Sequence, residues 1–397
     1  MQERRFAAPH HNRLRHLVGC IALLLAATTL SAQPALTADD TLDRFAATAP
    51  HLNPRPNQAE LEQTLRNVCE TESARACLRY IEENKLRVRS ALPNNPAYWQ
   101  AYRAALDAPP YNPIECYLDT AVSPEKCFHH PAQHQLMETT YSWLWYQLAR
   151  EEEDLIAQFT AIYQRIRTRS AQSPSMLNKM IDIAMLSIVQ HQLGLLLGRS
   201  AERGELENVR ALRRLATPHA KEVRSLGPAF AGEIALRTNA RKRFEAPERY
   251  GQLEMGDELD NGVLDALLHD ESYEDYLKAL VAVSEQSWSD YWQYGFTTMP
   301  LAIPSGEDAY APILGALSTH VQTGRSSEVP VFLLPALADI YQGLSDPGIP
   351  DRPPPPFWEW RWLDAEQTLC LIPQERAVGP SDFTRERGAC MAYFPLP

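Results

Sequence analysis

Two cysteines and two histidines between residues 116 and 134 have side chains that could bind a metal. They are Cys116, Cys127, His130 and His134. Sulfur and ring-nitrogen ligands of this kind hold Zn²⁺ in tetrahedral sites, whose two cysteines usually lie about two to four residues apart. Here ten residues separate the cysteines. The spacing therefore favours a disulfide that closes a short loop and stabilises the fold by about 3 kcal/mol.

A second metal-binding arrangement would use no cysteine. Pro131 suits the first position of a helix, where its missing N–H costs nothing, so His130 is expected at the helix N-cap. His134 and Glu138 follow at spacings of four residues, which places all three side chains on one helix face. This face lacks the H-E-x-x-H spacing that puts a base beside a metal. A solvated first turn is the favoured interpretation, and no metal or other cofactor is expected.

The cysteines fall into close pairs along the chain. Apart from Cys20, in the N-terminal segment, they are Cys69 with Cys77, Cys116 with Cys127, and Cys370 with Cys390. An oxidising compartment converts paired thiols into cross-links. Six cysteines allow fifteen pairings, and proximity in the sequence favours the three local ones. The sequence therefore predicts three local disulfides in an exported protein.

Charged residues within apolar helices are the candidates for catalysis. Residues 176–198 form the most apolar part of the body and are expected to be buried on most sides, so Asp182 and His191 need partners there. Glu233 can pair with Arg237 four residues later in the same helix. Structural roles are favoured for all four. An enzyme would bring two or more of them together in a deep pocket.

The sequence lacks the motifs that most clearly indicate a chemistry. It contains no phosphate-binding glycine loop, no G-x-S-x-G, no H-E-x-x-H and no C-x-x-C. The chain has a net charge of −12. Once the four Arg and one Glu of the first sixteen residues are removed, about −15 remains, and such a body repels phosphate backbones and anionic lipid surfaces. No nucleic-acid partner is expected.

The N-terminus has the features of an export signal. Residues 1–32 combine an arginine-rich start with an uncharged run from Leu17 to Ala32, which predicts a signal peptide or an N-terminal signal anchor. The membrane would be contacted only through this segment, if it is not cleaved. The chain has no Asn-x-Ser/Thr acceptor, and a bacterial periplasm is the preferred location. Residues 33–56 are small, polar and broken by proline, which predicts a flexible tether.

The body of the chain is predicted to be all-α. Apolar residues recur at helical spacing through residues 57–345, with breakers such as "LPNNP" and "APPYNP" between the runs. The pattern predicts about ten or eleven helices. Short connections favour antiparallel neighbours, so the expected architecture is an array or a toroid of antiparallel helical hairpins.

Residues 346–397 form a proline- and tryptophan-rich tail. Trp358, Trp360 and Trp362 alternate with other residues, which predicts a strand with its indoles on one face. "TLCLIP" and "ACMAYF" are expected to pair as a β-hairpin that sets Cys370 opposite Cys390. The tryptophan row either packs this small module against the helices, which is the favoured interpretation, or binds a partner.

Two functional hypotheses follow from these patterns. The first is a non-catalytic envelope scaffold that binds a protein or a polymer. The alternative is a periplasmic enzyme, a hydrolase or lyase, that degrades a polysaccharide or cell-wall polymer in the groove of a helical toroid. The two differ in whether the candidate charged residues meet in one pocket.

Overall fold

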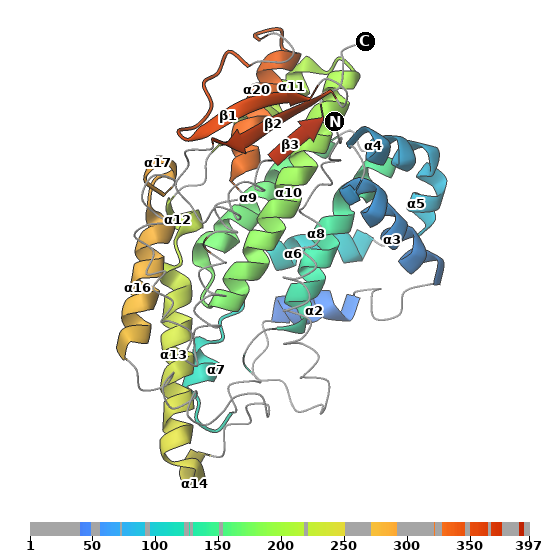
Figure 1. The fold of residues 1–397 in the computed structure, drawn as a ribbon. Coiled ribbons are helices and arrows are strands. Elements are labelled where there is room, and N and C mark those ends of the chain that lie inside the picture. The colour runs from blue at the N-terminus through green and yellow to red at the C-terminus, as the bar shows by residue number, and fades with distance from the viewer. Residues whose placement is uncertain are drawn as a thin grey trace, which may run out of the picture.

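The computed structural model is mostly helical, with a small antiparallel sheet formed by the C-terminal part of the chain (Figure 1). The predicted export segment, residues 1–32, lies outside the described residues. The structure describes residues 40–48, 56–71, 74–91, 96–122, 127, 130–150, 154–217, 221–250, 271–291, 321, 328–345, 350–363, 367–374 and 389–392.

Three long helices form the centre of the body: α8 (Pro131–Arg150), α9 (Leu155–Gln172) and α10 (Met176–Glu202). α10 packs against α8, α9 and α11 (Leu206–Leu215). Its apolar residues lie on all sides, so buried positions run from Met176 to Ala201, as the sequence predicts. α10 is also long and apolar enough to cross a membrane, but its neighbours on several sides make it a core helix.

Six helices precede α8 in the described residues, and the first five are α2 (Asp40–Thr48), α3 (Pro56–Thr71), α4 (Ala74–Glu83), α5 (Lys85–Ala91) and α6 (Pro96–Asp107). α2 corrects one expectation, because it lies within the segment predicted to be a flexible tether. It packs against α6 and α8 and fully buries Leu42 and Phe45. These two side chains, three residues apart, give the short helix an apolar face that the composition of the segment hides.

A second group of helices packs beside α9 and α10 (Figure 1). They are α7 (Ile114–Leu118), α12 (Lys221–Arg224), α13 (Gly227–Glu245), α14 (Pro247–Tyr250), α16 (Glu271–Glu285) and α17 (Trp288–Asp290). Of these, α13 contacts both α9 and α10, and α12 contacts α9. The described residues thus hold more helices than the ten or so expected. Helices as short as α7, α12 and α14 do not produce a periodic apolar pattern, so they cannot be predicted from the sequence.

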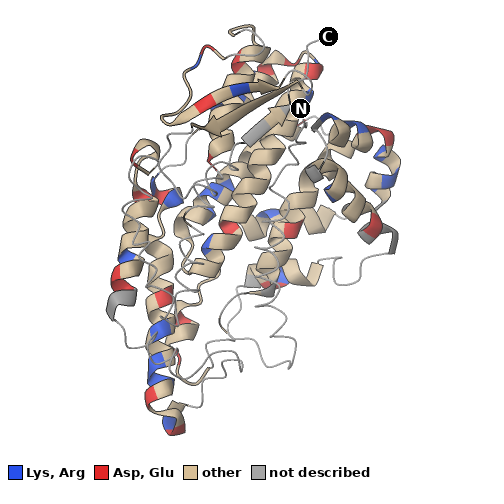
Figure 2. Cartoon of the chain, viewed as in Figure 1, with Lys and Arg blue, Asp and Glu red and all other residues tan. Residues whose placement is uncertain are grey.

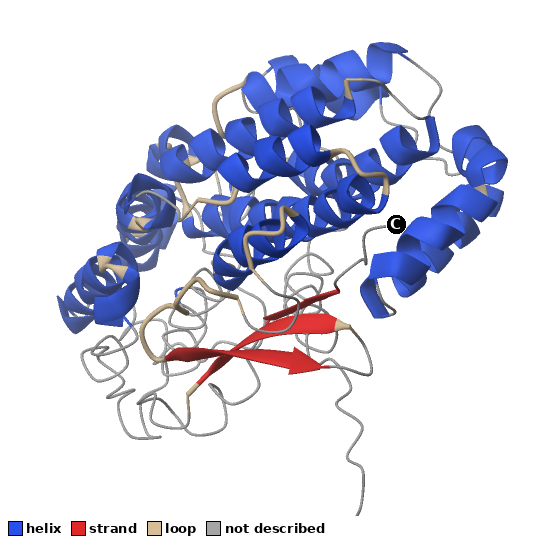
Figure 3. Ribbon diagram, turned by 90° about the horizontal axis from the view of Figure 1, so that it is seen from above, coloured by secondary structure: helices blue, strands red, loops and turns tan. Residues whose placement is uncertain are grey.

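The C-terminal strands form one sheet in the order β1–β2–β3, from β1 (Trp358–Leu363), β2 (Thr368–Pro373) and β3 (Ala389–Ala392). The predicted hairpin is confirmed, and Cys370 of β2 lies directly opposite Cys390 of β3. The tryptophan strand adds to the hairpin as a third strand, with Trp360 opposite Leu371. Seen from above, the sheet lies along one side of the helices (Figure 3), where β2 and β3 contact α20 (Val329–Tyr341).

Local disulfides close short loops in the helical body. Cys69 bonds to Cys77 with a Cα–Cα distance of 4.5 Å, and Cys116 bonds to Cys127 with a distance of 5.6 Å. Both distances lie in the usual range for a disulfide. Cys370 is also disulfide-bonded, which agrees with its register opposite Cys390. The cysteines are therefore used as cross-links, which is compatible with an exported protein in an oxidising compartment.

Candidate functional site

The turn between α9 and α10 is the centre of a buried polar cluster, which we call the α9–α10 junction: Arg169, Ser173, Ser175, Lys179 and Asp182. All five residues are at least 97% buried. Ser175 caps α10, because its hydroxyl accepts the N–H of Asn178 at 3.3 Å. The remaining members bring three side-chain charges into the core beside this cap.

Asp182 is buried, as the sequence predicts, and its partners come from α9 and the turn. The Ser173 hydroxyl donates a hydrogen bond to Oδ2 of Asp182. Nε of Arg169 lies 3.6 Å from Oδ1, while Nη1 of the same arginine donates to the carbonyl of Ala105. Burial raises the pKa of Asp182, and Arg169 opposes that rise. The carboxylate holds α9 against α10.

Lys179 lies one turn before Asp182 on the same helix. Its Nζ donates to the carbonyl oxygens of Ser170 and Val223, the latter at 2.6 Å. Burial lowers the pKa of Lys179 to about 8, and the Asp182 charge opposes this shift. The ammonium therefore joins α10 to the end of α9 and to α12. A lysine in the same apolar run as Asp182 is a sequence signal for this cluster that was missed.

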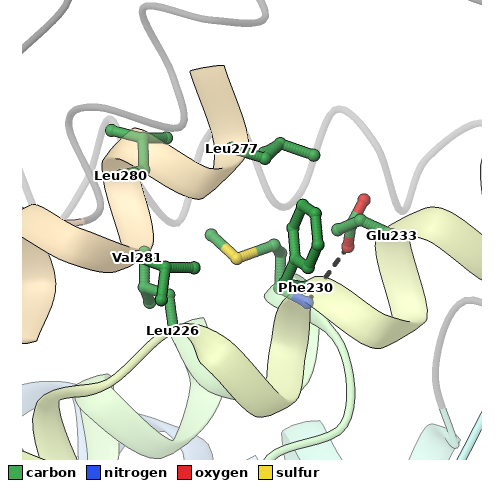
Figure 4. A pocket seen from close by; sticks show the side chains of 7 residues that line it. Leu226, Phe230, Glu233, Leu277, Leu280 and Val281 are labelled. Carbon is green, nitrogen blue, oxygen red and sulfur yellow. Dashed lines mark hydrogen bonds between the residues drawn. The ribbon is translucent and has the colours of Figure 1, made fainter. Parts of the chain in front are cut away.

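Glu233 of α13 approaches the first turn of α10. One oxygen of its carboxylate accepts the N–H of Met176 at 3.1 Å (Figure 4). The preceding residue, Gly232, makes this approach possible: a Cβ built there would lie 2.2 Å from the carbonyl oxygen of Pro174. Burial raises the pKa of Glu233 to about 7, and the Met176 hydrogen bond opposes the shift. Part of the residue keeps contact with solvent.

A small cavity of about 10 Å³ lies beside Glu233 (Figure 4). Apart from Glu233, its lining is apolar: Met176, Leu226, Phe230, Leu277, Leu280 and Val281. A cavity needs roughly 10–15 Å³ to hold one water molecule. The space is therefore too small for a sugar ring or a peptide, and among the described residues Glu233 faces packed side chains.

Arg237 and His191 are the remaining two candidate residues. Arg237 forms its ion pair with Glu274 of α16, at 3.2 Å, so the expected bond to Glu233 is replaced by bonds from each residue to a different helix. His191 is exposed, which corrects the expectation that it is buried with Asp182. It occupies one of the few outward positions of α10. The four candidate residues are thus not gathered around one pocket in the described structure.

The residues of the two metal hypotheses, within 116–138, make other bonds in the structure. The Cys116–Cys127 disulfide leaves no thiolate for the Cys–His arrangement. His130 caps α8, because its Nδ1 accepts the N–H of Ala132 while its Nε2 lies 3.1 Å from Oδ1 of Asp43. Within the described ranges, no group of three or more His, Cys, Asp or Glu side chains is arranged to hold a metal ion.

The other two members of the predicted histidine face are also accounted for. His134 is half-exposed, and its Nε2 lies 4.0 Å from Glu138. Burial, followed by the nearby Arg66 charge, lowers the pKa of His134. Glu138 pairs with Arg66 of α3. The face therefore contributes to the contact between α8 and α3.

The tryptophan row divides between packing and partial exposure. Trp358 is 1% exposed, and its ring centroid lies 5.7 Å from that of Trp288. Trp360 and Trp362 are half-buried against the core, and the Trp360 indole N–H donates to the carbonyl of Arg352 at 2.7 Å. The first indole therefore packs the sheet on the helices, as favoured from the sequence, while the other two keep some accessible surface.

Comparison with known proteins finds no matching family model, no matching curated protein and no matching solved structure.

Proposed function

We propose that this chain is an exported, disulfide-stabilised helical scaffold that binds another protein or a polymer without chemically changing it. The observation that carries the proposal is how the candidate charged groups are used. Asp182 and Lys179 bond across α9, α10 and α12, and Glu233 and Arg237 bond to α10 and α16. Groups committed to joining helices serve a rigid frame and are poorly placed to handle a substrate.

The proposal includes the periplasm as the location and an N-terminal signal in residues 1–32. Cross-links at Cys69–Cys77 and Cys116–Cys127 support an oxidising compartment. It also includes the arrangement of the body as an array of antiparallel helical hairpins. Contacts between consecutive helices, such as α3 with α4 and α9 with α10, support that arrangement.

The binding surface that we propose is the edge of the sheet at β1. In the described residues β1 pairs only with β2, and an extended partner that adds to the other edge of β1 would lengthen the sheet by one strand. Trp360 and Trp362 are half-buried on this strand. Indoles with an accessible face can stack on a sugar ring or on an apolar peptide side chain.

Site-specific photo-crosslinking in living cells tests this proposal. A photoreactive amino acid at position 362, in the full chain with its own N-terminal segment, is expected to give a cross-linked adduct in the envelope fraction. Position 86 is the matched control, because Leu86 is 78% exposed on α5, a helix that packs on α3, α4 and α8. Equal adduct yields at 362 and 86, or recovery of the chain in the cytosol, would contradict the proposal.

The absence of turnover is tested on the purified chain. Incubated with isolated cell-wall polymer or envelope polysaccharide, it is expected to sediment with its ligand and to release no soluble fragments. Fragment release that is lost in a folded Glu233→Gln variant would establish an enzyme in its place.

A further inference from the structure

Three elements meet at Glu233. α13 carries the residue, the first turn of α10 donates the Met176 N–H, and α16 covers the site with Leu277, Leu280 and Val281 (Figure 4). A carboxylate has about four acceptor positions. Among the described residues Met176 supplies the one hydrogen bond to Glu233. The ionised group is therefore under-solvated, whereas a protonated carboxyl is compatible with an apolar surrounding.

The neighbouring titratable and charged groups give the ionised form little help. On α7, burial raises the pKa of the Tyr117 hydroxyl, and the nearby Glu233 carboxylate and Tyr111 raise it further. On α13 itself, Arg237 is directed to Glu274 at the N-terminal end of α16. The nearest residues of α10 and α16 offer apolar side chains. None of the described residues that line the cavity carries a positive charge.

The two ends of α16 are held differently. At its C-terminal end, the Ser284 hydroxyl accepts the N–H of Leu226 at 3.1 Å, and Glu285 bonds both Ser225 and Lys221. Between residues 274 and 281, α16 is held by the apolar contacts around the cavity and by the ion pair of the largely buried Arg237 with the half-exposed Glu274. The contact that Glu233 touches thus depends mainly on apolar packing, whereas the C-terminal end of α16 is held by hydrogen bonds and an ion pair.

We propose that Glu233 is a proton-sensitive contact that controls how firmly residues 274–281 of α16 pack on α10 and α13. The neutral carboxyl keeps the cavity dry and α16 in place. The ionised carboxylate draws water into the cavity and loosens residues 274–281, while residues 284–286 stay attached to α12. This inference does not depend on what the chain binds.

The direction of the pH effect follows from proton linkage. Burial raises the pKa of Glu233 from its ordinary 4.5 to about 7 in the folded state. Between these two pH values the closed form holds a proton that the open form releases, so closure weakens as pH rises. Below the ordinary value both forms are protonated and the effect vanishes. Above the folded value the weakening is complete.

Hydrogen exchange measured by mass spectrometry at pH 6 and pH 8 tests the proposal, after correction for the intrinsic exchange rate. Residues 274–281 are expected to exchange about three- to tenfold faster at pH 8. Glu233→Gln, which is neutral at both values, should abolish this ratio. Peptides covering 284–286 should show the same protection at both pH values.

Glu274→Gln is the matched control, since it removes the ion pair with Arg237 and leaves the cavity intact. It should speed exchange of residues 274–281 at both pH values and preserve the ratio between them. A wild-type ratio near one, or a ratio that persists in Glu233→Gln, overturns the proposal. If Glu233→Gln does not fold, a carbon NMR titration of the wild-type glutamates decides, because no glutamate titrating near pH 7 would also overturn it.

Discussion

At the scale of single residues, the body is organised by charges that bond to the backbone of other elements. Lys179 reaches two carbonyl oxygens, and Asp182 lies between Ser173 and Arg169. A buried cluster of charges of this kind stabilises the fold little more than apolar side chains of the same volume would. Removing one member, however, leaves the remaining charges buried without a counter-charge, which is strongly destabilising. The α9–α10 junction is therefore the position at which a single substitution does the most damage.

Asp182→Asn tests this at the residue scale. The change leaves Arg169 and Lys179 buried without their counter-charge, and we expect the free energy of unfolding to fall by about 3–5 kcal/mol. Urea denaturation followed by circular dichroism measures it. The control is Asp275→Asn on α16, where the Lys278–Asp275 pair is exposed and the expected loss is about 0–1 kcal/mol. Equal losses at the two sites would show that the junction is not a cluster of coupled charges.

At the scale of elements, close backbone approach decides how α13 packs on the α9–α10 turn. Gly232 lies against Pro174 so closely that any Cβ would overlap the carbonyl oxygen. This contact brings Glu233 to Met176 and lets α16 cover both. The packing of three helices thus depends on one residue without a side chain.

Gly232→Ala is expected to destabilise the chain by at least about 1–3 kcal/mol, because a backbone carbonyl cannot move aside as a side chain can. Gly194→Ala on α10 is the matched control. Its Cβ would lie 3.4 Å from the flexible Met391 side chain, and the gain in helix propensity of about 1 kcal/mol offsets this contact. Thermal unfolding of both variants measures the difference. A neutral Gly232→Ala would show that α13 does not rest on the turn in solution.

The helices and strands also differ in how well the sequence predicts them. Local spacing in the sequence predicts three features of the structure. The alternating tryptophans predict the strand, the paired cysteines predict the disulfides, and the largely apolar run of α10 predicts the core helix. Partners on other helices are not encoded locally. For that reason an i, i+4 pair was expected for Glu233 and Arg237, and the burial of His191 was misjudged on a helix that keeps a few outward positions.

At the scale of the whole molecule, the C-terminal tail is built into the helical body. Asp339 of α20 bonds Arg213 of α11 at 2.8 Å and Arg352 of the tail at 3.1 Å. Trp358 is buried against Trp288, which follows α16. The cartoon coloured by charge agrees with this arrangement, because the central helix α10 carries few charged residues (Figure 2).

A chain that ends at residue 345 tests whether the tail is separable. α20 is buried along nearly its whole length, with Leu333, Leu334 and Leu337 among its covered side chains. Removing the sheet would expose this apolar surface, and the loss of Trp358 alone is expected to cost about 3–5 kcal/mol. We therefore expect the shortened chain to bind a hydrophobic dye and to aggregate, while Asp339→Asn in the full chain loosens the tail enough for faster proteolysis between 345 and 357. A shortened chain that unfolds cooperatively at the temperature of the full chain would show that the tail is an independent module, because the helical core would then be complete without its strands.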